Sequence, residues 1–129
     1  MTYLQYDRIE KELLAAIPEL AEYENDLRKW NREPGQYIVL WFVLKPFLQK
    51  LLDAGENEEG LSRAFAFLED MARSKDLDVV NLLYVGLLES LVGDRMRLRQ
   101  SWQYMGKETR ALARRAAHAL LCEGNLPEA

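Results

Sequence analysis

The residues best suited to acid–base or nucleophilic chemistry are His118 and Cys122, each the only residue of its type in a chain of 129 residues. Histidine titrates near neutral pH, and a cysteine thiolate is a strong nucleophile. A spacing of four residues would bring the two side chains to one face of a helix. A catalytic pair also needs an orienting group and an oxyanion site, for which the sequence offers no candidate. We therefore expect an amphipathic terminal helix here, and we do not expect an enzyme.

Metal and nucleotide sites find no support in the residue pattern. A zinc site needs several converging ligands, and the chain has a single histidine and a single cysteine. The acidic connector at residues 56–60 lacks the alternating oxygen ligands and the final glutamate of a calcium loop, so we interpret it as a solvated turn. The seven glycines are isolated, which argues against a phosphate-binding loop. No metal and no other cofactor is expected.

Charge is distributed unevenly along the chain. Residues 53–78 contain eight acidic and three basic side chains, whereas residues 94–118 contain seven basic and two acidic ones. An acidic surface of this kind can steer a basic partner toward it. The candidate partner-binding residues are the carboxylates Asp53, Glu56, Glu58, Glu59, Asp76 and Asp78. The alternative, solvated faces that attract each other within or between chains, stays open, and so does a homodimer.

Several classes of function and location are disfavoured by composition. The net charge of −4 gives no general attraction to nucleic acid or anionic lipid, so neither is the expected partner, although the basic end between Arg95 and Arg115 leaves RNA binding as an alternative. One cysteine cannot form an intrachain disulfide, and the N-terminus lacks the pattern of a signal peptide. The longest apolar run, residues 37–44, is shorter than the roughly 20 residues of a membrane span. We expect a cytoplasmic protein that does not enter the membrane.

Helices must position these residues, because apolar side chains recur at three- and four-residue spacing along most of the chain. The spacing predicts about seven helices, over residues 4–16, 19–30, 37–52, 61–74, 78–91, about 95–105 and 108–122. Residues 37–44 favour a strand by composition, but the run continues to residue 52 and no other segment offers a pairing strand. Pro46 should kink or restart that helix. The prediction is one compact all-α domain over residues 1–129, frayed from about residue 124.

The helices predicted at residues 61–74 and 78–91 are joined by only a few polar residues. They should therefore pack antiparallel as a hairpin similar to a HEAT unit, although no second copy occurs at a fixed period. Gly86 interrupts the second of these helices at a cost of about 1 kcal/mol relative to alanine. We expect a neighbouring helix to approach closely at that position.

Aromatic residues gather around the turn at Pro34 and Gly35. Tryptophan is enriched at binding hot spots, so Trp30 and Trp41 are candidate anchors for a partner. Both occupy positions of apolar stripes, and we therefore favour core packing over exposure for them. Tyr104, beside a helix boundary, presents the same choice.

Five stretches of the chain together resemble an uncharacterised bacterial family of small all-helical proteins. They are Ile17-Pro18-Glu19-Leu20, Glu33-Pro34-Gly35, Lys45-Pro46-Phe47-Leu48, Phe67-Leu68-Glu69-Asp70-Met71-Ala72 and Tyr104-Met105-Gly106-Lys107-Glu108-Thr109-Arg110. Members of that family resemble the immunity proteins of polymorphic toxin systems, which neutralise a toxin by binding it. The resemblance implies a protein-binding domain whose partner is a cognate toxin, and it assigns no functional residue. The alternative is a HEAT-like adaptor or scaffold without catalytic activity.

Overall fold

The computed structural model describes residues 3–55 and 57–127. Within those two ranges the chain folds into seven helices and contains no β-strand, which confirms the all-α prediction. Five of the helices are regular: α1 (Ile9–Ala16), α2 (Ala21–Arg28), α5 (Glu58–Ala72), α8 (Arg95–Trp102) and α9 (Lys107–Ala119). Short 3₁₀ turns precede α1 and α2, and the turn before α2 begins at Pro18, whose fixed φ suits the start of a helix.

The other two helices each contain a π-turn. The first runs through α3 (Gln36–Val39), a π-turn at Leu40–Leu44 and α4 (Lys45–Ala54), with the N–H of Lys45 bonded to the carbonyl of Leu40. Pro46 follows immediately and has no N–H to continue a regular ladder, so the predicted interruption takes the form of this π-turn.

The second interrupted helix runs through α6 (Leu77–Leu83), a π-turn at Tyr84–Leu88 and α7 (Glu89–Val92). The two π-turns contact each other, and Gly86 lies where they meet. A Cβ atom at Gly86 would be 3.2 Å from Leu40 Cδ2 and 3.6 Å from Tyr37 Cδ1. The predicted close approach of a neighbouring helix is therefore confirmed.

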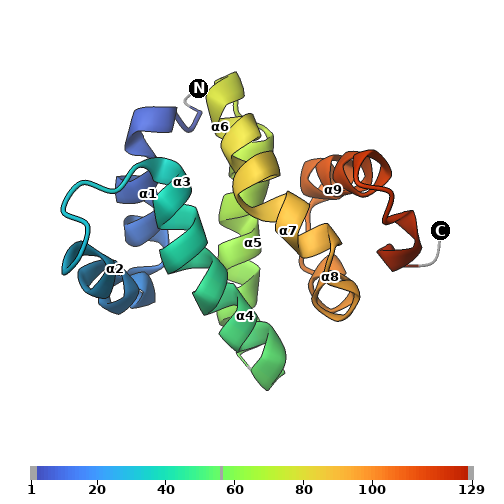
Figure 1. Ribbon diagram of the computed structural model, residues 1–129, viewed down its shortest axis with the longest axis horizontal. Coiled ribbons are helices and arrows are strands. Elements are labelled where there is room, and N and C mark those ends of the chain that lie inside the picture. The colour runs from blue at the N-terminus through green and yellow to red at the C-terminus, as the bar shows by residue number, and fades with distance from the viewer. Residues whose placement is uncertain (1–2, 56, 128–129) are drawn as a thin grey trace.

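Three long helices form the centre of the molecule (Figure 1). The helix α3–α4 runs in one direction, α5 returns, and α6–α7 reverses again, so the predicted antiparallel hairpin of α5 with α6 is confirmed. The short helices α1 and α2 lie on one side of this centre, and α8 and α9 lie on the other. None of the helices in the described ranges is both long enough and apolar enough to cross a bilayer.

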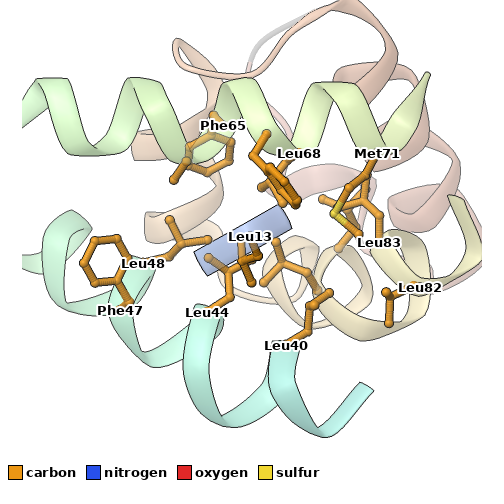
Figure 2. Packing of buried hydrophobic residues seen from close by; sticks show 14 of the residues in the cluster. Leu13, Leu40, Leu44, Phe47, Leu48, Phe65, Leu68, Met71, Leu82 and Leu83 are labelled. Carbon is orange, nitrogen blue, oxygen red and sulfur yellow. The ribbon is translucent and has the colours of Figure 1, made fainter. Parts of the chain in front are cut away.

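The core lies where the three central helices meet α1 (Figure 2). Leu13 of α1, Leu44 of the first π-turn, Leu68 of α5 and Leu83 of α6 point toward one another and are fully buried. Burial of each such side chain contributes about 1.5–3 kcal/mol, so this cluster contributes substantially to the stability of the fold.

The C-terminal segment departs from the sequence prediction. α9 ends at Ala119 rather than near Cys122, and Leu121 adopts a left-handed conformation with φ 57°. The side chain of Arg99 donates hydrogen bonds to the carbonyls of Gly124, Asn125 and Leu126 at 3.0–3.3 Å. Where the sequence predicts a frayed tail, residues 124–126 are thus attached to α8, while residues 128–129 lie outside the described ranges.

Candidate interaction surfaces

The acidic residues predicted to bind a partner form two separate groups. Asp53, Glu58 and Glu59 lie near the start of α5, whereas Asp76 and Asp78 lie beyond its end. The 15 residues of α5 span about 22 Å, so the two groups stand at opposite ends of the central helices (Figure 1). Glu56 lies outside the described residues. The structure therefore does not bring the predicted contact residues together on a single edge.

Asp53 is occupied by an ion pair within the chain. Its two carboxylate oxygens accept hydrogen bonds of 2.7 and 3.0 Å from the guanidinium of Arg97, which also pairs with Asp94 at 3.1 Å. The hydrogen bonds from Arg97 lower the pKa of Asp53; they outweigh the partial loss of solvation, which raises that pKa, and the positive charge of Arg97 adds a smaller lowering. This pair joins the acidic and basic parts of the chain, as expected if those parts attract each other within one molecule.

The carboxylate of Asp76 accepts hydrogen bonds from backbone N–H groups. One oxygen accepts a hydrogen bond of 3.0 Å from the N–H of Asp78 and caps α6, and the other accepts one of 2.9 Å from the N–H of Tyr6. Ser74 assists, because its hydroxyl donates to the carbonyl of Leu4 at 2.5 Å. Asp76 therefore attaches the N-terminal segment to the α5–α6 connection, while Asp78 remains exposed.

His118 and Cys122 are separated by the end of the helix. The left-handed conformation at Leu121 removes the helical geometry that a four-residue spacing needs. The exposed imidazole of His118 instead lies with Nδ1 at 2.6 Å from Glu123 Oε2, and this hydrogen bond raises the pKa of His118. Among residues 3–55 and 57–127, no three His, Cys, Asp or Glu side chains gather as a metal site would require.

Glu69 joins two of the stretches that carry the family resemblance, residues 67–72 and residues 104–110. Its carboxylate accepts hydrogen bonds from the N–H of Glu108 at 3.0 Å, and from the N–H and hydroxyl of Thr109 at 2.9 and 2.7 Å. It thereby caps the N-terminus of α9, where the helix dipole favours an anion. A Cβ atom at Gly106 would overlap Glu69 Cδ, so glycine leaves the space that the carboxylate fills. Sequence reasoning missed this role because the cap lies on a different helix.

The side chains of Trp30, Trp41 and Phe42 form an exposed group that we call the aromatic surface. Their exposed fractions are 64%, 41% and 49%, so the expectation that Trp30 and Trp41 pack in the core was wrong. Trp30 and Phe42 meet edge to face at 5.5 Å between ring centroids. Tyr37 lies alongside, 6.0 Å from Trp41. The surface therefore combines the end of α2 with the first π-turn.

The first π-turn determines which of its side chains are buried and which belong to the aromatic surface. Leu40, Val43 and Leu44 are buried against the core, which leaves Trp41 and Phe42 side by side on the outside. The spacing of the leucines at positions 40, 44, 48 and 52 already defines an inward stripe that excludes both aromatic residues. That pattern could have predicted their exposure. Tyr104 is half-buried and stacks on Phe65 at 6.2 Å, in agreement with a packing role.

These observations define the class of protein. It is an all-helical domain with an exposed aromatic surface, and most of its polar clusters stabilise the fold. The chain belongs to the family described as domain of unknown function DUF7674, whose model matches residues 10–119. The match confirms the expectation of an uncharacterised family. No curated protein and no solved structure matches the chain significantly.

Proposed function

We propose that the chain is a protein-binding domain, and specifically an immunity-type protein that neutralises a toxin by direct binding. The observation that carries the proposal is the aromatic surface. Scattered exposed apolar residues are ordinary, but here the exposed rings of Trp30 and Phe42 contact each other, and Trp41, the neighbour of Phe42 in the chain, is exposed as well, so these residues form a patch that water solvates poorly. Tryptophan is among the residues most enriched at binding hot spots, where it supplies a large contact area with few rotatable bonds.

The proposal that the partner is a toxin rests on the motif resemblance. The architecture is compatible with this proposal. Neutralisation by occlusion requires a stable surface and no reacting group. The side chains that stand out chemically in this chain, Glu69 and Asp76, are engaged with backbone N–H groups. A HEAT-like adaptor would use the same surface for a different partner, so the two functions separate only when the partner is identified.

The first experiment is co-purification of the full chain from its native host at moderate salt. We expect a partner in stoichiometric amount with the wild-type chain, and its loss with Trp30→Ala/Trp41→Ala. Met96→Ala is the matched control, because Met96 is an equally prominent exposed side chain, 68% exposed, on α8. Equal recovery of the partner with all three chains would refute a binding role for the aromatic surface.

The second experiment identifies the kind of partner. The captured protein is expressed alone and together with this chain in a bacterial host. Arrest of growth by the partner alone, with rescue by the wild-type chain and not by Trp30→Ala/Trp41→Ala, is the result expected for an immunity protein. A harmless partner that still binds through the aromatic surface would favour the adaptor and overturn the immunity proposal.

A further inference from the structure

We infer that the exposed face of α9 binds the phosphate backbone of nucleic acid, through a surface separate from the aromatic surface. We call Lys107, Arg110, Arg114 and Arg115 the basic face. Three-, four- and one-residue steps place these cations along about 12 Å of a single helix. In Figure 1, α9 and α2 lie on opposite sides of the central helices.

In the part of the chain that the structure describes, the arginines of the basic face lack the carboxylate partners that Arg28, Arg63 and Arg97 have. Arg28 pairs with Glu10 and Glu24, and Arg63 pairs with Glu19. Within the described residues, no carboxylate oxygen lies within 4.0 Å of the side-chain nitrogens of Lys107, Arg114 or Arg115. The positive charge of α9 is therefore not neutralised by direct pairing.

Aromatic rings hold the guanidinium groups in place instead. Arg110 and Arg114 each lie 5.3 Å from the ring centroid of Trp102, and Arg115 lies 5.7 Å from that of Tyr84. Arg110 also donates to the carbonyl of Trp102, at 2.8 and 3.1 Å. A guanidinium stacked on a ring keeps edge N–H donors for a phosphate and loses less freedom when it binds one.

The composition of this face favours nucleic acid over a protein partner. Besides charged and histidine side chains, the exposed residues of α9 are Ala111 and Ala119, so α9 itself contributes no large apolar side chain to this face. Cores of protein interfaces are depleted of lysine and depend on such anchors, whereas interfaces with nucleic acid are polar and strongly positive. Since the whole chain carries a charge of −4, the attraction should be short-ranged and readily weakened by salt.

The test is fluorescence anisotropy with a labelled oligouridylate of about 16 nucleotides, the upper end of single-strand site sizes. Salt is varied from about 0.05 to about 0.2 M. We expect binding whose log–log salt slope lies between about −2 and −3, since three or four phosphates at about 0.7 each are neutralised. Arg114→Glu/Arg115→Glu should lower the affinity at least about tenfold, and a circular dichroism melt checks that it folds.

Lys11→Glu/Lys50→Glu is the matched control, because both lysines are exposed and the change in net charge is the same. Affinity within about threefold of wild type for this control supports a local site, whereas equal losses in both double variants, or no binding at the lowest salt, overturn it. Oligodeoxyuridylate of the same length distinguishes DNA from RNA as the source of the phosphates. Displacement of the RNA by polyglutamate at equal charge concentration would assign the face to an acidic protein and refute the inference.

Discussion

At the level of single residues, the carboxylate of Glu69 connects two helices that are distant in sequence. It satisfies two backbone N–H groups and one hydroxyl at the start of α9. Burial by itself would raise the pKa of Glu69, but the hydrogen bonds from Thr109 and Glu108 outweigh it and lower that pKa. The ionised form of Glu69 is therefore the one that stabilises the fold.

Glu69→Gln should lower the free energy of unfolding by about 1–3 kcal/mol, because an amide replaces the charged acceptor and leaves a donor unsatisfied. Asp70→Asn, at the exposed neighbouring position of α5, is the control and should change stability little. Urea unfolding measures both. Equal stability of the Glu69→Gln and Asp70→Asn chains would show that the cap contributes nothing.

The contribution of Glu69 to stability should depend on pH, and comparing wild type with Glu69→Gln measures this dependence. Since the pKa of Glu69 is lower in the folded chain, its contribution is complete above the unfolded-state pKa of about 4.3 and is lost as the pH falls through the folded-state value. The difference in unfolding free energy between wild type and Glu69→Gln should be constant near neutral pH and shrink below about pH 4.3. A difference that grows on acidification would contradict the assigned role.

At the level of elements, the facing π-turns restrict the residue at position 86. Gly86→Ala gains about 1 kcal/mol in helix propensity but forces a contact with Leu40 that costs about 1–3 kcal/mol. We expect a net loss of about 1 kcal/mol in urea unfolding. Gly35→Ala is the control, because nothing lies within 4 Å of a Cβ atom there.

Adding Leu40→Val tests the cause of that loss. The shorter side chain should cost less stability in the Gly86→Ala chain than in wild type, because it relieves the contact that alanine creates. Additive effects of the two substitutions would mean that Leu40 does not limit position 86. A more stable Gly86→Ala chain would show that the π-turns can separate without penalty.

The helices could be predicted from spacing, whereas the π-turns and the cap that Glu69 supplies to α9 could not. The inward leucine stripes identify the central helices, and Pro46 marks where the first of them becomes irregular. The π-turn formed there faces Gly86 of another helix, and a local sequence pattern does not contain that contact. Similarly, His118 and Cys122 have helical spacing, but the chain turns at Leu121 to place its last segment against Arg99.

At the level of the whole molecule, the charge asymmetry of the sequence persists only in part. Asp53 and Arg97 come from its acidic and basic halves and pair with each other. Position in an apolar stripe predicts burial of Trp30 and Trp41, but adjacent residues compete for one inward face, and Leu40, Val43 and Leu44 occupy it around Trp41. Charge counts along a chain cannot show which carboxylates are already engaged with the backbone.

The aromatic surface and the basic face should act independently, because α2, next to which Trp30 lies, and α9 stand on opposite sides of the central helices (Figure 1). Trp30→Ala/Trp41→Ala should bind oligouridylate as wild type does, and Arg114→Glu/Arg115→Glu should still capture the partner protein. Effects of distant sites usually add within about 0.5 kcal/mol, so each change should leave the other affinity within roughly threefold. A strong cross-effect would mean that one ligand spans both surfaces.

The cap at α9 also bears on how this family can diverge. Position 106 must stay without a side chain for as long as position 69 carries a long carboxylate, because the two compete for one volume. A mutation at either position alone removes the cap or displaces it, so the viable route passes through a paired replacement. Relatives that bear alanine or serine at position 106 should therefore carry a shorter residue at position 69 and obtain the α9 cap from another side chain.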